Sequence, residues 1–191
     1  MRRVISLLGV VALMLFAVGS AGALDLVPCD FLTGGGFIIT TASGSPAHGN
    51  FGVGGSCKQG GDGHGLWGHL EYHDHGTGLN VHWLTVTGYF FLEPNTRVIC
   101  GTARTNQIPG EVGWVVTATD NGKGEDDVFS IEVPALGYSQ AGPLEGGNIV
   151  LHKPNRSTGF FGPDSSNCPV ECPPGFHRDP KTGLCVPNNV D

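Results

Sequence analysis

The sequence has little positive charge, few charged residues overall and no helical hydrophobic period beyond its first segment. Lysine and arginine number 10 against 17 aspartate and glutamate residues, and the formal net charge is −7 at pH 7. Nucleic acids and anionic membranes are bound through basic surfaces, so this balance argues against both as partners. The missing helical period argues against a helical fold.

Catalytic motifs are also missing. The chain contains no GxSxG sequence, no phosphate-cradling GxxxxGK loop and no HExxH pair. No cysteine stands beside a histidine at the spacing of a known family. Paired carboxylates that meet only in the folded protein are still possible, because a sequence does not identify them. The sequence therefore favours a protein that is not an enzyme, without deciding the question.

The one long apolar run lies at the beginning. A basic start, MRR, precedes an apolar stretch from Val4 to Val18, and the small residues AGA end at Ala23. This order predicts a secretory signal peptide over residues 1–23. A membrane anchor is the alternative, but a span needs about 20 apolar residues and no second run follows. We expect a secreted, extracellular or periplasmic protein, with a net charge near −9 after the loss of Arg2 and Arg3.

Six cysteines in an exported chain predict disulfides, because the environment outside the cytoplasm is oxidising. The Pro- and Gly-rich segment CPPGFHRDPKTGLC needs a covalent closure between its two ends. Six cysteines allow 15 connectivities, and zinc bound by two tail cysteines is an alternative. The expected pairs are Cys172–Cys185, Cys57–Cys100 and Cys29–Cys168, and the alternative zinc ligands are Cys168 and Cys172.

Beyond residue 30 the sequence alternates between large apolar and polar residues, which is the period of a β-strand. Residues 128–133, VFSIEV, are an example. Segments rich in turn-forming residues separate the expected strands. These lie at residues 37–41, 50–55, 97–105, 112–118, 128–133, 137–141 and 147–153, with a hairpin within 65–92.

Eight or nine short strands predict an all-β fold, either an antiparallel β-barrel or a two-sheet β-sandwich. We favour the barrel, with the first strand (37–41) paired to the last (149–153), because closure leaves no free edge. The barrel domain would occupy residues 24–153. A linker rich in Gly, Ser and Pro at 154–167 and a small disulfide-stapled, Cys-rich tail at 168–191 would follow.

The central hairpin has a register that can be predicted from its turn, His75-Gly76-Thr77-Gly78. A four-residue loop places Glu71 opposite His82, and side chains then alternate between the two faces. The expected outer face carries Trp67, His69, Glu71, His73, Asn80 and His82. The expected core face carries Leu66, Leu70, Tyr72, Val81 and Trp83.

The outer face of this hairpin is the strongest candidate for chemistry. Cross-strand neighbours have Cβ atoms about 5 Å apart, so imidazoles and a carboxylate there could share a zinc or copper ion. A solvated polar face of a sheet is the alternative. The candidate metal ligands are His69, Glu71, His73 and His82, with His75 and Asp74 within reach from the turn.

Two further features suggest ligands. Carboxylates in the turn DNGKGEDD could hold calcium, although a solvated acidic turn is the alternative. Trp67 is the one tryptophan expected outside the core, where it could stack on a sugar ring. The candidate calcium ligands are Asp120, Glu125, Asp126 and Asp127.

Over residues 29–155 the chain also carries a series of motifs in a fixed order. They are CDFLTGGGFI, NFGVGG, LWGHLEYHDHGTGLNVH, VTGYFF, ICGTARTN, a DNG turn followed by DVFSIEV, and GGNIVLHKPN. In these motifs the chain resembles the post-COAP-type domain of secreted bacterial proteins. The resemblance implies a compact all-β exported module and supplies no catalytic residues. The tail from Cys168 lies outside it.

Together these observations favour a non-enzymatic, exported β-barrel module with a binding or structural role at the cell exterior. Its interior could hold a small apolar ligand, as some small barrels do. The alternative is a metal-binding protein or a metal-dependent enzyme that uses the histidine cluster of the hairpin. The identity of any ligand or cofactor does not follow from the sequence.

Overall fold

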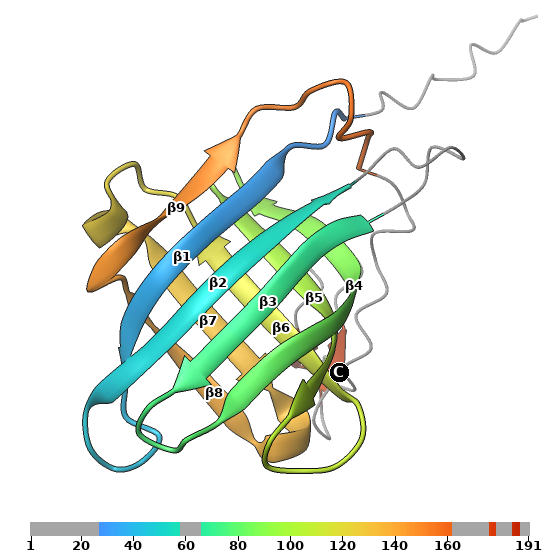
Figure 1. Cartoon of the computed structure of the whole chain (residues 1–191). Helices are drawn as coiled ribbons and strands as arrows, with labels where there is room; N and C mark the ends of the chain where they lie inside the picture. The colour runs from blue at the N-terminus through green and yellow to red at the C-terminus, as the bar shows by residue number, and fades with distance from the viewer. Residues whose placement is uncertain (1–26, 58–65, 162–175, 179–184, 188–191) are drawn as a thin grey trace, which may run out of the picture.

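The computed structural model describes residues 27–57, 66–161, 176–178 and 185–187. Nine strands form one antiparallel sheet in the order β8-β7-β6-β5-β4-β3-β2-β1-β9 (Figure 1). They are β1 (Phe31–Thr40), β2 (Ala47–Cys57), β3 (Leu66–Asp74), β4 (Asn80–Glu93), β5 (Thr96–Thr105), β6 (Val112–Thr119), β7 (Val128–Val133), β8 (Tyr138–Pro143) and β9 (Gly146–His152). Two 3-10 turns, η1 (Gly124–Asp126) and η2 (Pro134–Leu136), flank β7. The short strands β10 (Phe176–Arg178) and β11 (Cys185–Pro187) form a separate pair.

Several predictions fall outside these ranges. The signal peptide, the end of the linker and the tail cysteines Cys168 and Cys172 lie outside the described residues. Among the residues that are described, no helix is long and apolar enough to cross a membrane.

The sheet is strongly curled into a half-barrel, so that β7 and β8 lie across from β1 and β2 (Figure 1). The prediction of an all-β fold is confirmed. The first strand also pairs with the last as expected, but the ladder runs from Phe31↔His152 to Phe37↔Gly146, so that of the expected residues 37–41 only Phe37 takes part. This pairing does not close the sheet, however, because β8 and β9 are the two ends of the strand order. The ladder between β1 and β9 extends the sheet by one strand.

Glycines and bulges shape the sheet. The run Gly34 to Gly36 was expected to precede the first strand, but it lies inside β1. A Cβ at Gly36 would lie 2.1 Å from the carbonyl oxygen of Gly146, so only glycine allows β1 and β9 to approach this closely. β4 has three register irregularities against β5, and such bulges bend a strand and increase its twist.

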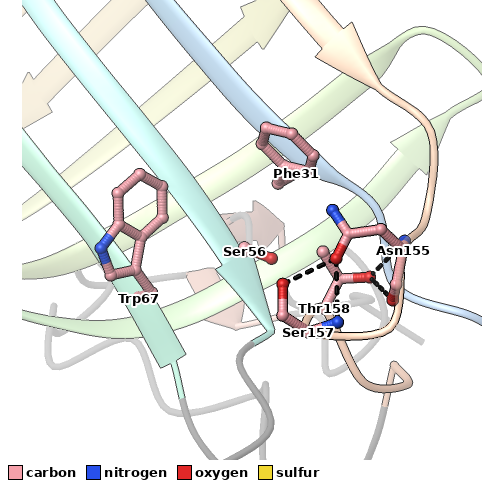
Figure 2. Close-up of a pocket in the computed structure, with 6 residues that line it drawn as sticks. All are labelled: Phe31, Ser56, Trp67, Asn155, Ser157 and Thr158. Atoms are coloured by element: carbon pink, nitrogen blue, oxygen red, sulfur yellow. Dashed lines mark hydrogen bonds between the residues drawn. The ribbon is translucent and has the colours of Figure 1, made fainter.

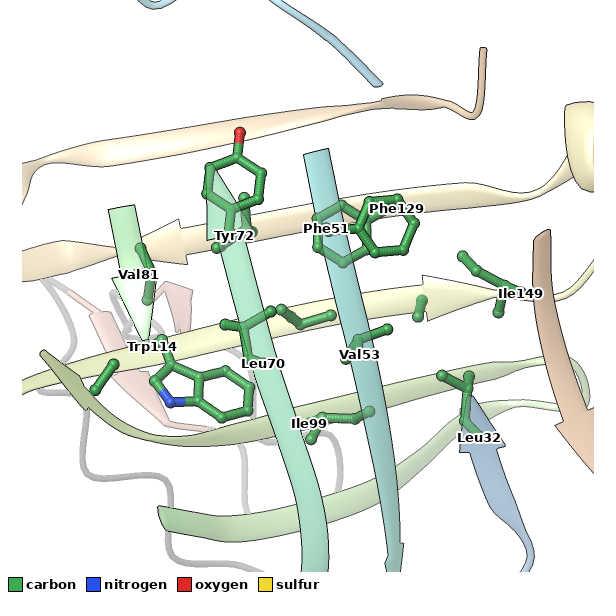
Figure 3. Packing of buried hydrophobic residues seen from close by; sticks show 14 of the residues in the cluster. Leu32, Phe51, Val53, Leu70, Tyr72, Val81, Ile99, Trp114, Phe129 and Ile149 are labelled. Carbon is green, nitrogen blue, oxygen red and sulfur yellow. The ribbon is translucent and has the colours of Figure 1, made fainter. Parts of the chain in front are cut away.

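The concave face of the sheet holds the core (Figure 3). Phe51 of β2 stacks on Phe129 of β7 with ring centroids 3.8 Å apart, which joins the two sides of the half-barrel. The predicted core face of the hairpin is confirmed, since Leu70, Tyr72 and Val81 are buried and Leu66 and Trp83 pack against the core. Other fully buried side chains are Leu32, Val53, Ile99, Trp114 and Ile149.

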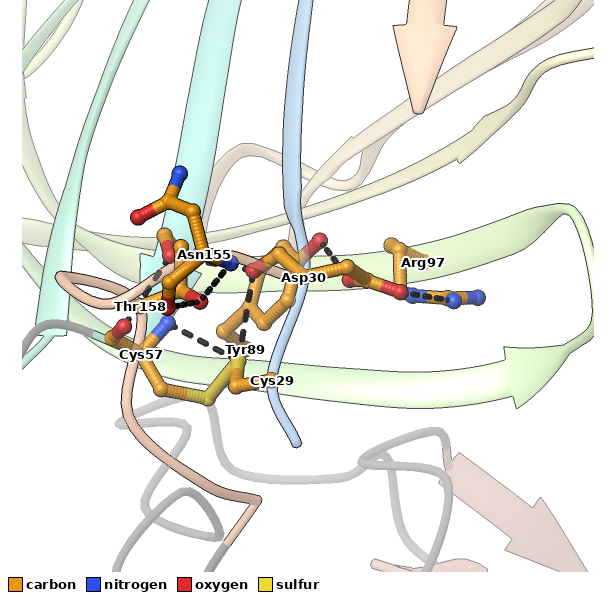
Figure 4. The surroundings of a disulfide bond; sticks show 8 residues. Cys29, Asp30, Cys57, Tyr89, Arg97, Asn155 and Thr158 are labelled. Atoms are coloured by element: carbon orange, nitrogen blue, oxygen red, sulfur yellow. Dashed lines mark hydrogen bonds and ion pairs between the residues drawn. A yellow bond between two sulfur atoms is a disulfide. The ribbon is translucent and has the colours of Figure 1, made fainter. Parts of the chain in front are cut away.

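The described disulfide corrects the predicted pairing. Cys29 is bonded to Cys57, with Cα atoms 5.9 Å apart (Figure 4), so the pairs Cys57–Cys100 and Cys29–Cys168 are wrong. Phe31 lies opposite Ser56, and this register brings Cys29 beside the end of β2. Cys57 belongs to the main core, whereas Cys100 packs in a second cluster with Phe90, Val98 and Val115. Cys100 is disulfide-bonded as well.

Candidate functional site

The outer face of β2, β3 and β4 contains a hollow of about 320 Å³, here called the Gly52 hollow. The predicted register of the hairpin is confirmed here, because Glu71 pairs with His82 and His73 with Asn80. On the other side of β3, Gly52 lies opposite Glu71 and Asn50 opposite His73. The polar residues around the hollow are Asn50, Glu71, His73, Asn80 and His82.

The hollow exists because its floor is bare backbone. Gly52 occupies an outer position of β2, and a Cβ built there would meet no atom within 4 Å. Its neighbour across the β1–β2 ladder is another glycine, Gly35. Two adjacent strands therefore lack side chains in the same row, and the polar groups of the flanking positions stand around the gap.

The candidate metal ligands form pairs around this hollow. His82 Nδ1 lies 2.6 Å from Glu71 Oε1, and both side chains are more than half exposed. His73 Nδ1 forms a hydrogen bond with Asn80 Oδ1, and its ring contacts His75 edge to face at 4.2 Å between centroids. In the described ranges no group of three or more His, Cys, Asp or Glu side chains is placed to hold a metal ion.

His69, the fourth candidate ligand, lies away from the Gly52 hollow. It contacts Trp67 edge to face, with ring centroids 6.0 Å apart. The sequence thus predicted correctly that these side chains share one face. The structure brings three of them to one hollow and leaves His69 outside it.

Asp74, which was expected within reach of a metal, is fully buried and belongs to the turn instead. Its carboxylate accepts hydrogen bonds from Thr40, from Tyr138 and from the backbone N–H of Gly76, and Thr77 donates to it as well. Burial opposes ionisation of Asp74, but these hydrogen bonds outweigh it and hold the pKa of the carboxyl below its usual range.

The same network perturbs two tyrosines. Burial raises the pKa of Tyr72 to about 12, against the opposing effect of its hydrogen bond with Tyr138. Burial, the bond to Tyr72 and the charge of Asp74 raise the pKa of Tyr138 as well. Because Tyr138 begins β8 and Asp74 ends β3, the network holds one free end of the sheet to the central hairpin.

Two of the four predicted calcium ligands hold the other end of the sheet. Asp127 is fully buried, and its Oδ2 accepts a hydrogen bond of 2.7 Å from the backbone N–H of Ile149. Asp120 Oδ2 accepts one of 2.7 Å from the N–H of Leu151. Both donors belong to β9, the last strand in the order of the described sheet. Glu125 and Asp126 are exposed in η1, so the four carboxylates have two different environments.

A second hollow, of about 230 Å³, lies on the same outer face and is here called the Trp67 hollow (Figure 2). Trp67 is 39% exposed, which confirms its expected place outside the core. Trp114 is buried and Trp83 packs against the core. Sequence reasoning missed the other residues, because they are brought there by the β1–β2–β3 register and by the segment after β9. They are Phe31, Ser56, Asn155, Ser157 and Thr158.

A buried ion pair beside the disulfide was also missed (Figure 4). Arg97 Nε donates to Asp30 Oδ1 at 3.0 Å, and the guanidinium makes a second hydrogen bond to Oδ2. The hydroxyl of Tyr89 donates to the same carboxylate at 2.7 Å. Arg97 is the second residue of β5, in which every residue from Thr96 to Gly101 is buried, and an alternating pattern does not distinguish such a position from an exposed one.

No family model, curated protein or solved structure matches this chain. The resemblance to secreted bacterial domains therefore stays a prediction.

Proposed function

We propose that this chain is an exported, non-enzymatic binding module that holds a polar ligand in the Gly52 hollow. The observation that carries the proposal is the bare backbone floor of Gly52, surrounded by polar side chains from three strands. Export is supported by the signal-peptide pattern and by the Cys29–Cys57 disulfide.

The chemistry of the lining favours a ligand rich in hydroxyl groups. The amides of Asn50 and Asn80 can each donate and accept hydrogen bonds, a carboxylate accepts them, and an imidazole can do either. Such side chains, fixed on strands of one sheet, present groups of both kinds in a small area. Because Glu71 is the one carboxylate among them and the whole chain is acidic, an anionic ligand is disfavoured.

Replacement of Gly52 by isoleucine tests the proposal. The new side chain enters open space at a position without positive φ, so the fold is retained while the hollow is filled. The matched control is Ala141→Ile, which adds the same side chain at an exposed position of β8.

The oxidised protein would be screened by thermal shift against soluble sugars, polyols, amino acids and hydroxy acids. We expect some of these compounds to raise the melting temperature of the wild type and of the control, through mass action. They should not raise that of Gly52→Ile. If no compound shifts the wild type, or if Gly52→Ile responds equally, the proposal is wrong.

A metal-binding protein is the second candidate, because Glu71, His73 and His82 line the same hollow. Binding of zinc or copper would require His73 to leave Asn80 and turn towards the Glu71–His82 pair. Elemental analysis of protein prepared without a histidine tag tests this. Stoichiometric metal that is lost in His73→Ala would support it, and metal retained in that variant would contradict it.

A further inference from the structure

Trp67 lies across the neighbouring strand because that strand has a glycine beneath it. A Cβ at Gly54 would come within 2.9 Å of His69 Cε1 and 3.4 Å of Trp67 Cη2. The indole and the imidazole therefore both cover Gly54, which is buried although it occupies an outer position of β2. The remaining surface of the indole faces solvent, and the residue is 39% exposed. Trp67 thus forms a fixed aromatic platform on the sheet.

A second aromatic ring stands two strands away in the same row. The strand registers place Phe31, Ser56 and Trp67 side by side. Neighbouring strands are about 4.8 Å apart, so the backbones of Phe31 and Trp67 are about 10 Å apart, with the small Ser56 between them. The Phe31 ring is held in place by His152, on which it stacks at 4.2 Å with an angle of 5° between the rings. His152 is fixed in turn by a 2.9 Å hydrogen bond with Thr33.

Polar groups close one side of the space between the two rings (Figure 2). Asn155 Oδ1 accepts hydrogen bonds from the backbone N–H and the hydroxyl of Ser157, at 2.9 and 2.6 Å. These two bonds fix the orientation of the amide, whose Nδ2 can then donate to a ligand. A platform, a second aromatic ring in the same row and an oriented amide donor suit a pyranose ring, whose faces carry C–H groups and whose rim carries hydroxyls.

The Trp67 hollow and the Gly52 hollow lie along the same strand. Trp67 and Glu71 are four residues apart on β3, which corresponds to about 13 Å at the usual rise per residue. A single sugar does not span this length, whereas an oligosaccharide of a few units does.

We infer that the ligand of this face is a neutral polysaccharide, with one sugar ring stacked on Trp67 and a neighbouring part of the chain in the Gly52 hollow. This inference rests on the proposed function and specifies its ligand. A neutral polymer is favoured over an acidic one, because the protein itself carries a net charge of −7.

Affinity electrophoresis in native gels that contain dextran, laminarin or xyloglucan tests the inference, with anionic alginate as the comparison. We expect at least one neutral polymer to retard the wild type. Trp67→Ala should weaken that binding about tenfold, from the loss of stacking and apolar contact, and Trp67→Phe should retain most of it. The control Val128→Ala removes another exposed apolar side chain, on β7, and should bind as the wild type does. Circular dichroism checks that each variant is folded.

The outcomes separate the two proposals. Binding lost in both Trp67→Ala and Gly52→Ile supports both. Binding lost in Gly52→Ile alone overturns the role of Trp67 and leaves the proposed function standing. Binding lost in Trp67→Ala alone supports the sugar subsite and contradicts the Gly52 hollow as the ligand site. If no neutral polymer retards the wild type, or alginate alone does, the inference is wrong, while the screen of small compounds still decides the proposed function.

Discussion

Replacement of Arg97 by methionine is expected to cost about 3–5 kcal/mol of unfolding free energy, the usual effect of removing one partner of a buried ion pair. Arg97 is 2% exposed and Asp30 is 8% exposed. In the variant the carboxylate of Asp30 keeps only the hydrogen bond from Tyr89 and loses its counter-charge. The carbonyl oxygens of Glu93 and Thr96, which now accept hydrogen bonds from Arg97 at 2.7 Å, lose this donor as well.

Urea unfolding of the oxidised protein measures this loss. With a slope of about 2 kcal/mol per molar urea, the midpoint should fall by about 2 M while the slope is unchanged. The double variant Asp30→Leu with Arg97→Met removes both charges, and it should recover part of the stability because no unpaired charge remains buried. A loss below about 1 kcal/mol in Arg97→Met would refute the reasoning, since it would mean that the Asp30 carboxylate is accommodated without its counter-charge at little cost.

Three further predictions concern the parts that hold the curled sheet together. Replacing both Cys29 and Cys57 by alanine should lower the unfolding free energy by about 3–4 kcal/mol, as the loop of 28 residues implies, and chemical denaturation measures it. The pKa of Asp74 is lower in the folded than in the unfolded state. Its contribution to the free energy of unfolding is therefore complete above about pH 4 and is lost as the pH falls through the folded pKa. Asp74→Asn should make stability less dependent on pH in unfolding curves recorded from about pH 6 to pH 2. Asp127→Ala leaves the buried N–H of Ile149 without its acceptor, at a cost of about 1–3 kcal/mol. Faster hydrogen exchange at that amide would confirm this, and unchanged exchange would contradict it.

The sequence predicted what is decided locally. The alternation of side chains and the HGTG turn are contained in one short segment, and they were enough to place Glu71 opposite His82 and Tyr72 in the core. The pairing of Cys29 with Cys57 depends instead on the register between two strands that a turn of different length would shift. Local patterns do not determine this register, so the expected disulfides were wrong.

The acidic turn shows a second kind of limit. Its carboxylates were considered as calcium ligands because their partners are not visible in the sequence around them. Asp120 and Asp127 accept hydrogen bonds from backbone groups of β9, more than 20 residues further along the chain. An unpaired strand edge needs such acceptors wherever it is covered, because buried N–H groups are costly when they lack a partner. Asp120 and Asp127 therefore act as acceptors for the edge of β9, and this role becomes visible only once the order of strands in the sheet is known.

The glycines of the sheet can be divided by what a side chain would meet there. At Gly36 and Gly101 a Cβ would come within about 2 Å of a backbone oxygen of the neighbouring strand, so the fold itself requires glycine. At Gly52 a Cβ meets nothing, and the residue does not have the positive φ that glycine is needed for. Glycine in a strand costs about 0.5–1 kcal/mol relative to alanine, and neither packing nor backbone conformation accounts for that cost at Gly52. A requirement for empty space over β2 does account for it, and this is the requirement that a ligand in the Gly52 hollow would impose.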